Sequence, residues 1–358
     1  MTARADVAIV GAGIAGASLA AELAPHASVL LIEAEDHPGY HSTGRSAAFW
    51  SESYGGPLVQ PLTSASGAFL AERGFLRPRG ALHIAEASGR AALEAMERQF
   101  AGTRVRLERV ADPAARVPGL RPGWDAALWE PSCADIDVAA LHGFYLAAAK
   151  RSGARLVAGT RVGRAERRGG LWRIGEGIEA AVLVDAAGAW ADEVAAAAGV
   201  APLGIRPYRR TIVQLRVAPP VPADLPLVID AEGRFYFKPE AGGRLWLSPH
   251  DETACEACDC APEEIDVAIA IDRLERAVDW RIERVERSWA GLRSFAPDRL
   301  PVYGFDRAAE GFFWFAGQGG FGIQTAPAAA RLGAALLLGR EAEPGLDSAH
   351  YAPGRFRS

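Results

Sequence analysis

The stretch that most constrains the fold runs from Asp6 to Glu33 and reads as a strand, a glycine turn, a helix and a second strand. Residues 7–10 form a short apolar run, suited to a buried parallel strand, that leads into Gly11-x-Gly13-x-x-Gly16. In this motif the first glycine permits a tight turn, the second lets the backbone approach a pyrophosphate, and the third lets the helix pack closely on the sheet. The sequence therefore predicts a βαβ dinucleotide-binding unit.

The end of the second predicted strand indicates which dinucleotide is bound. Residues 28–32 form this strand and deliver Glu33, seventeen residues after Gly16. A carboxylate there can accept hydrogen bonds from both hydroxyls of an adenosine ribose and disfavours a 2′-phosphate. The helix between the strands, which we expect to reach about Leu23 before Pro25, would present its positive N-terminal end to the diphosphate. FAD or NAD is therefore favoured over NADP.

Composition and charge narrow the class of protein. The 358 residues suffice for two domains, and 49% hydrophobic with 23% charged residues is ordinary for a soluble globular chain. A net charge of −5, with both signs interspersed, gives no basic field for nucleic acid, so we expect a small-molecule partner. The first strand begins by about Asp6, which leaves no room for a signal peptide, and no apolar run approaches the ~20 residues of a transmembrane segment. We therefore expect a cytoplasmic protein.

A cysteine-rich stretch, C-E-A-C-D-C at 255–260, raises the question of a metal. A structural zinc site needs four ligands, Cys133 is distant in the sequence, and His250 is the only nearby imidazole. We therefore expect no metal site. The stretch is predicted to be a polar loop between a strand that ends near Pro249 and a helix that opens at residues 262–264.

A second stretch rich in small residues carries a family resemblance. Residues 39–48, G-Y-H-S-T-G-R-S-A-A, follow the glycine motif and the acid-ended strand. In this order they resemble the FAD site of the D-amino-acid oxidase superfamily, which includes glycine and sarcosine oxidases, and within it the bacterial D-arginine dehydrogenases. The resemblance covers most of the chain, from Asp6 to Ala329. For His41 and Arg45 the alternative is a purely local role in loop hydrogen bonds.

The resemblance implies a mixed α/β fold, with a Rossmann-like FAD-binding domain and a second substrate domain built on an antiparallel sheet. The alternating segments 210–217, 234–238 and 244–248 read as antiparallel strands of that second domain. The chain is expected to pass between the domains several times. The expected FAD-binding domain comprises residues 1–79, 136–205 and 289–358, and the expected substrate domain comprises residues 80–135 and 206–288.

The resemblance also implies a set of FAD contacts. Val162 would contact adenine through its backbone, Gly188 would form a second glycine turn, and the loop 317–325 would hold the flavin O2 and the ribityl chain through N–H groups at a helix N-terminus. The expected FAD is non-covalent. The expected cofactor-binding residues are Gly11, Gly13, Ile14, Ala15, Gly16, Glu33, Ala34, His41, Ser42, Thr43, Arg45, Ser46, Ala47, Ala48, Val162, Ala187, Gly188, Trp190, Arg293, Gly317, Gly319, Gly320, Phe321, Gly322, Ile323 and Gln324.

Arginines are expected to fix the substrate. Flavin supplies the redox chemistry, so the protein must hold a donor C–H and bind its carboxylate, which a guanidinium grips with two parallel hydrogen bonds. Arg293 matches the family's carboxylate-binding arginine, and Arg210 matches a second one, with a surface salt bridge as the alternative for Arg210. Tyr236 matches a tyrosine that points to the same carboxylate.

A lid and a glutamine complete the expected catalytic set. Residues 51–57 combine Tyr54 with two glycines, a composition typical of a mobile loop that closes over a ligand, and they resemble the family's active-site lid. A surface turn is the alternative. Gln324 is expected to line the same cavity. The expected catalytic residues are Tyr54, Arg210, Tyr236, Arg293 and Gln324.

The expected reaction is oxidative deamination of a D-amino acid. Hydride transfer from the α-carbon to flavin N5 gives an imino acid, which water converts to a 2-oxo acid and ammonia, and an electron acceptor then reoxidises the flavin. Two alternatives stay open. One is a flavoprotein that oxidises another small carboxylate, an L-2-hydroxy acid or an N-methyl amino acid, and the other is a nucleotide-binding regulator without catalysis.

The sequence departs from the D-arginine enzymes at two positions that bear on specificity. Phe49 stands where those enzymes carry an active-site histidine, and Ala81 where they carry the glutamate that takes a cationic side chain. Glu52 on the expected lid could supply the missing charge. We expect neutral or apolar D-amino acids to be preferred over D-arginine.

Overall fold

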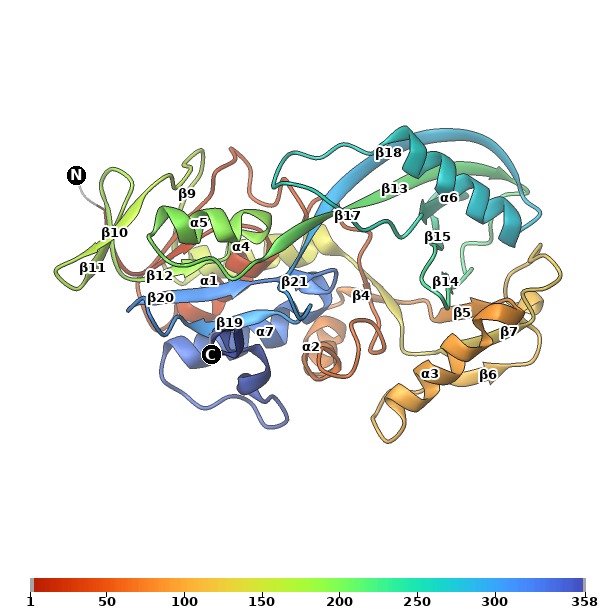
Figure 1. The fold of residues 1–358 in the computed structure, drawn as a ribbon, viewed down its shortest axis with the longest axis horizontal. Helices are drawn as coiled ribbons and strands as arrows, with labels where there is room; N and C mark the ends of the chain where they lie inside the picture. The colour runs from red at the N-terminus through yellow and green to blue at the C-terminus, as the bar shows by residue number, and fades with distance from the viewer. Residues whose placement is uncertain (1–2, 357–358) are drawn as a thin grey trace.

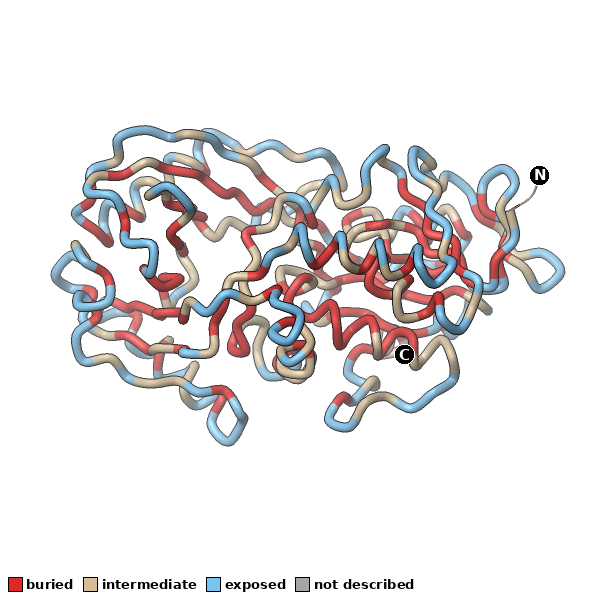
Figure 2. The backbone as a smooth tube through the Cα atoms, turned by 180° about the vertical axis from the view of Figure 1, so that it is seen from behind, coloured by how far each residue is buried: buried red, intermediate tan, exposed pale blue. Residues whose placement is uncertain are grey.

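The structure is a computed structural model that describes residues 3–356. Two large sheets are present, and the long strands β13 (Arg206–Ala218) and β18 (Arg281–Phe295) extend from the middle of the molecule to one end (Figure 1). Buried residues run through both sheets, whereas the hairpin loops at the ends are exposed (Figure 2). No described helix is long and apolar enough to cross a membrane.

The first sheet is built on the predicted βαβ unit. Parallel strands β1 (Ala3–Val10) and β2 (Val29–Ile32) are joined by helix α1 (Ile14–Leu23), which confirms the predicted elements. The sheet order is β10-β11-β12-β1-β2-β9, with β20 on β12 and β19 on β20. The further strands are β9 (Arg155–Val157), β10 (Ala165–Arg168), β11 (Leu171–Ile174), β12 (Ile178–Asp185), β19 (Val302–Phe305) and β20 (Phe312–Ala316).

Two hydrophobic cores cover the faces of this sheet. Side chains alternate along β1, so Ala8 and Val10 enter one core and Val7 and Ile9 the other. The first core also contains residues of helix α5 (Ala191–Ala197), and the second contains residues of α1 and α7 (Gly322–Leu337). Helix α4 (Val138–Arg151) packs beside α1, and the Asp137 side chain accepts a hydrogen bond from the Ala140 amide, as an N-cap does. Burial on both faces explains why the strands read as continuous apolar runs.

The second sheet has ten strands, in the order β21-β18-β13-β16-β15-β14-β5-β7-β6, with β17 on β13. The predicted antiparallel pairing of β13, β16 and β15 is confirmed, whereas β14 and β5 pair in parallel. Helices α6 (Glu264–Ala277) and α3 (Arg90–Phe100) pack on this sheet. The further strands are β5 (Ala81–Ala85), β6 (Glu108–Val110), β7 (Ala126–Glu130), β14 (Leu227–Asp230), β15 (Tyr236–Glu240), β16 (Arg244–Ser248), β17 (Thr253–Ala254) and β21 (Gln318–Gly319).

A small third sheet contains β3 (Phe49–Trp50), β8 (Ala134–Ile136) and β4 (Leu76–Pro78). Helix α2 (Gln60–Glu72) has Pro61 in its first turn, where proline is favourable. The sheets and helices together confirm the predicted mixed α/β fold class.

Candidate active site

A cavity of about 470 Å³ begins at the carboxyl ends of β1 and β2 and extends to β13 and β15 of the second sheet. This volume lies in the range of small-molecule sites, and the carboxyl ends of parallel strands are where open α/β sheets bind ligands. All five expected catalytic residues line the cavity: Tyr54, Arg210, Tyr236, Arg293 and Gln324.

The glycine turn after β1 forms one wall of the cavity. Gly11 has φ +100°, and a Cβ there would lie 2.4 Å from the Ala186 carbonyl oxygen, so only glycine fits. Gly13 lines the cavity and gives α1 no side-chain cap, which leaves the helix N-terminus available to a ligand. Gly16 does not line the cavity. A Cβ there would lie 1.8 Å from the Gly11 carbonyl oxygen, so Gly16 serves helix packing.

Glu33 lies at the end of β2 and is buried with a fixed orientation. Its Oε2 accepts a hydrogen bond of 2.8 Å from the Ala12 amide, and its Oε1 accepts one of 3.0 Å from the Glu35 amide. Each carboxylate oxygen has more than one lone pair, so these bonds leave acceptor capacity on the cavity side. This is the arrangement that a pair of ribose hydroxyls requires.

The loop 39–48 lines the cavity, but two of its side chains use their polar atoms elsewhere. His41 Nε2 lies 2.9 Å from Glu35 Oε1, and its ring packs on Trp190 with centroids 4.5 Å apart. The Arg45 guanidinium pairs with Asp259 and donates to the carbonyl oxygens of Cys260 and Ala290. The partner of His41 is local, as in the alternative for this residue, whereas the partners of Arg45 come from segments distant in the sequence.

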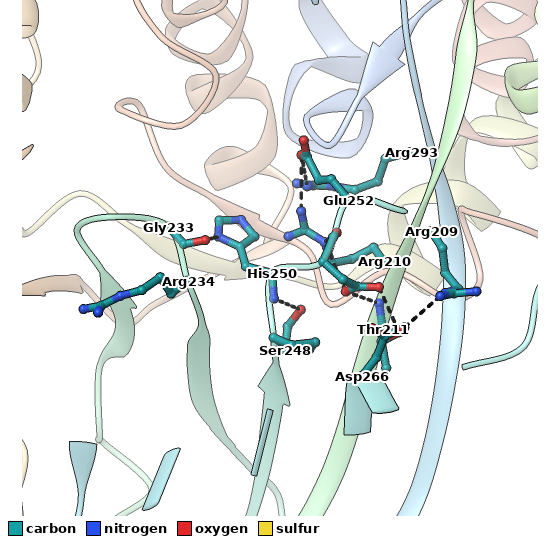
Figure 3. Close-up of polar contacts among 12 residues, drawn as sticks. Arg209, Arg210, Thr211, Gly233, Arg234, Ser248, His250, Glu252, Asp266 and Arg293 are labelled. Carbon is teal, nitrogen blue, oxygen red and sulfur yellow. Dashed lines mark hydrogen bonds and ion pairs between the residues drawn. The ribbon is translucent and has the colours of Figure 1, made fainter. Parts of the chain in front are cut away.

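Two arginines, the buried Arg210 and the half-buried Arg293, approach the cavity from adjacent strands. Arg210 on β13 and Arg293 on β18 donate to the same oxygen, Glu252 Oε1, at 3.4 and 3.3 Å (Figure 3). Arg210 Nη1 is buried and has no hydrogen-bond partner among residues 3–356. A buried donor without an acceptor is costly, so this atom indicates a site for an anionic ligand. The surface-salt-bridge alternative for Arg210 does not fit a guanidinium this buried.

Burial shifts the ionisation of these groups. Desolvation lowers the pKa of Arg210, and desolvation together with nearby Arg299 lowers the pKa of Arg293 to about 9. Desolvation raises the pKa of Tyr236, which keeps its hydroxyl protonated and able to donate. A ligand carboxylate would add a second counter-charge to the one that Glu252 gives the two guanidinium groups.

Gly320 allows two of these groups to approach the loop before α7. A Cβ on Gly320 would lie 2.0 Å from Arg293 Nη2 and 2.2 Å from the Tyr54 hydroxyl. The glycine therefore brings the start of α7, the arginine and the tyrosine together. Phe49 completes an aromatic wall, with its ring centroid 5.5 Å from that of Tyr54 and 6.0 Å from that of Tyr236.

The family can now be assigned. The profile of the family described as FAD dependent oxidoreductase (DAO) matches residues 6–336. This chain belongs to the FAD-dependent oxidoreductase family. Because the match spans nearly the whole chain, the predicted family and its FAD cofactor are confirmed.

Individual relatives are more distant. The chain is 32% identical over 172 residues to glycine oxidase of Pseudomonas aeruginosa, covering 47% of this chain and 44% of the relative. The alignments span about a third to a half of the length of the curated relatives. Among solved structures, glycine oxidase from Geobacillus kaustophilus has TM-score 0.86, 24% identity and 99% coverage of both chains. L-proline dehydrogenase from P. horikoshii has TM-score 0.86, 23% identity and coverage of 99% of this chain and 98% of its own. These two structures support the fold.

Most expected FAD contacts of this oxidoreductase lie on the cavity wall. Besides Gly16, the structure places Gly317 and Phe321 off the wall. Gly317 has φ +70° and packs near Ala296, and Phe321 packs in a small hydrophobic cluster. Both residues therefore support the loop 317–325 on the side that faces away from the cavity. The expected residues on the wall are Gly11, Gly13, Ile14, Ala15, Glu33, Ala34, His41, Ser42, Thr43, Arg45, Ser46, Ala47, Ala48, Val162, Ala187, Gly188, Trp190, Arg293, Gly319, Gly320, Gly322, Ile323 and Gln324.

Gln324 holds the loop that carries Tyr54. Its Nε2 donates to the Tyr54 carbonyl oxygen at 3.2 Å and to Thr63 Oγ1 at 2.9 Å, and its Oε1 accepts from the Ser51 amide at 3.2 Å. These bonds occupy the amide, which is only 2% exposed. Gln324 therefore positions the loop, and its polar atoms are not free to bind substrate.

The loop is also anchored from the second sheet. Glu130 on β7 is fully buried, and its Oε1 accepts from the Glu52 amide at 2.8 Å while its Oε2 accepts from Ser53 Oγ at 2.6 Å. The Glu52 side chain bonds Ser64 and pairs with Arg104, and it does not line the cavity. The expected mobile lid is thus held on both sides in this structure.

One further expectation needs correction, and one lining residue was not predicted. Ala81 does not face the substrate end, because it is fully buried in a cluster behind Ile212 and Tyr236. Sequence reasoning missed His250 as a lining residue, having considered it only as a metal ligand. Within residues 3–356 no group of three or more His, Cys, Asp or Glu side chains is arranged to hold a metal ion.

We expect acid precipitation of the protein to release its FAD, because the cofactor is bound without a covalent bond. The described residues that line the cavity include no cysteine, so no thiol is placed to attach the flavin. After precipitation, the yellow colour should appear in the supernatant. Colour that stays with the pellet would contradict non-covalent binding.

Proposed function

We propose that this FAD-dependent oxidoreductase oxidises D-amino acids to 2-oxo acids and ammonia. The observation that carries the proposal is the pair Arg210 and Arg293 on the cavity wall, with the buried Arg210 Nη1 unpaired among the described residues. Relatives named glycine oxidase and L-proline dehydrogenase support an amino acid as substrate. The D configuration is supported by the resemblance of residues 39–48 and of both arginines to the D-amino-acid enzymes.

In this proposal Arg293 and Arg210 bind the substrate carboxylate, and Tyr236 and Tyr54 donate hydrogen bonds beside it. Bound FAD supplies the acceptor for a hydride from the α-carbon. The chain's task is to hold that carbon in one orientation and to exclude water with the aromatic wall. A strong base is unnecessary when the amine is bound unprotonated, because the nitrogen lone pair expels the hydride.

The residues that line the cavity also suggest which sheet binds FAD and which binds the substrate. We propose that the first sheet and its helices form the FAD-binding domain, residues 1–79, 136–205 and 289–358. Most of the second sheet, with residues 80–135 and 206–288, would form the substrate domain, while the end of β18 after residue 288 and β21 would belong to the FAD-binding domain. Arg210 and Tyr236 then belong to the substrate domain, and the glycine turns belong to the FAD domain.

An anaerobic screen tests the proposal. D-amino acids should bleach the flavin absorbance of the purified protein, whereas L-2-hydroxy acids and N-methyl amino acids should not. Bleaching by either of those acids alone would favour the alternative substrates, which the same arginines could bind. A flavin that no small carboxylate reduces would favour a regulator without catalysis.

The substrate end of the cavity favours neutral or apolar side chains. The acids on the described cavity wall are Glu33, Glu35 and Glu193, which line it together with the glycine turn, the loop 39–48 and α5. A cationic side chain beside Phe49 and Ile212 would therefore lose water without gaining a counter-charge, at a cost of several kcal/mol. Each buried methylene contributes only about 0.8 kcal/mol in return.

We expect kcat/KM for D-methionine, D-leucine or D-phenylalanine to exceed that for D-arginine by at least about tenfold. Steady-state kinetics on the four substrates measures this ratio. Glu52→Gln is the matched control, since Glu52 faces Ser64 and Arg104 and should not alter the ratio. A preference for D-arginine would contradict the prediction, and a ratio that changes in the Glu52 variant would reinstate Glu52 as the missing charge.

A further inference from the structure

His250 has an unusual backbone conformation at the cavity wall. It follows β16 and has φ +57°, one of two positive φ values among the described non-glycine residues. Such a conformation is unfavourable unless neighbouring contacts hold it. The His250 amide donates to Ser248 Oγ at 3.2 Å (Figure 3). The His250 ring packs edge-on to Tyr236, with centroids 5.5 Å apart. The local structure thus fixes the ring at the cavity beside Arg210 and Tyr236.

The hydrogen bonds of the ring define its tautomer. His250 Nδ1 lies 2.8 Å from the Gly233 carbonyl oxygen, which can only accept, so Nδ1 carries the hydrogen. Nε2 then carries a lone pair and has no hydrogen-bond partner among residues 3–356; it is turned away from Gly233 (Figure 3). Burial, and next the charge of Arg210, lower the pKa of His250 to about 3, with Asp230 and Arg273 as further charged neighbours. The ring is therefore neutral near neutral pH.

We propose that His250 Nε2 accepts a hydrogen bond from an N–H group on the carbon next to the substrate carboxylate. A carboxylate bound by Arg210 places its α-substituent beside the neighbouring ring, and an unpaired acceptor on the wall favours a ligand that brings a donor. This inference rests on the proposed function and identifies the residue that binds the substrate amine.

His250 accepts a hydrogen bond and does not take the proton. The ammonium of a free amino acid titrates above neutral pH, so proton transfer from it to a ring of pKa about 3 is strongly disfavoured. The histidine therefore orients the amine through a hydrogen bond and leaves its proton in place.

Two unreactive acids of equal size test the proposal. Pyrrole-2-carboxylate has an N–H next to its carboxylate, and furan-2-carboxylate has a ring oxygen at the same place. Titrations of the FAD-loaded protein, followed by flavin absorbance and independently by tryptophan fluorescence, should give about tenfold tighter binding of the pyrrole acid. The preference should persist from about pH 5 to about pH 8, since the ring stays uncharged there.

Two variants of His250 distinguish the loss of the hydrogen-bond acceptor from a change in the fold. His250→Phe keeps a ring without nitrogen, and His250→Asn tolerates positive φ but is too short to reach the position of Nε2. Both should abolish the preference while changing furan-2-carboxylate binding by less than about threefold. Equal binding of the two acids by the wild type, or a preference retained in both variants, would overturn the His250 assignment even if D-amino acids bleach the flavin. If neither acid binds and no D-amino acid bleaches the flavin, the proposed function is wrong as well.

Discussion

Replacing Arg293 with lysine is expected to lower kcat/KM for D-amino acids by about 30-fold or more, mainly through KM, with unchanged FAD content. Lysine keeps the charge but cannot form two parallel hydrogen bonds to a carboxylate, a contact worth on the order of 2 kcal/mol. Water has little room to replace the lost hydrogen bond, because Arg293 and Tyr54 both lie close to Gly320. Steady-state kinetics and the flavin-to-protein absorbance ratio measure the two effects separately.

Arg299→Lys is the matched control for this variant. Arg299 also pairs with Glu252, at 2.7 Å, but its side chain is 49% exposed and it does not line the cavity. The control should stay within about threefold of the wild type. Wild-type kinetics for Arg293→Lys would remove Arg293 from the site.

Valine in place of Gly13 is expected to reduce bound FAD by at least about tenfold without unfolding the protein. Gly13 has φ −68°, and within 4 Å a Cβ would meet only Thr43 Oγ1, at 3.2 Å, so the backbone tolerates a side chain. The added methyl groups would occupy the cavity wall where the turn approaches the diphosphate. Flavin absorbance per mole of protein reports the loss, and circular dichroism reports the fold.

Gly143→Val provides the comparison for Gly13→Val. Gly143 lies on the exposed face of α4, and an added Cβ would meet nothing within 4 Å. This variant should retain its FAD. If Gly13→Val also retained it, the glycine turn would not be the diphosphate site.

The sequence predicted those parts of the fold whose causes are local. The strand at 7–10, the helix after Gly13 and the alternating strands of the second sheet follow from apolar periodicity, and the structure confirms them. The parallel pairing of β14 with β5 was not predictable, because 146 positions separate Leu82 from its cross-strand neighbour Val228, no turn signal links the two strands, and the side-chain pattern is satisfied by either direction. Periodicity therefore cannot establish which strands pair when they lie this far apart in the sequence.

The site shows the same limit. Two glycines in residues 51–57 suggested a mobile loop. The groups that anchor this loop belong to Glu130 and Gln324, which follow the loop residues they contact by 78 and 273 positions. His250 escaped notice because its role depends on a positive φ and on the Gly233 carbonyl oxygen, neither of which has a sequence signal at a histidine. The glycine turns were predictable because their chemistry resides in the backbone, which spacing alone can specify.

The anchoring of the Tyr54 loop has a consequence for how this cavity discriminates among ligands. A wall held by a buried carboxylate from the second sheet and a buried amide from helix α7 has little conformational freedom to lose when a ligand arrives. Binding therefore carries a small ordering cost, and the shape of the cavity is established during folding instead of during encounter. Selection among substrates then rests on preformed fit, and residues outside the cavity, Glu130 above all, share in setting it.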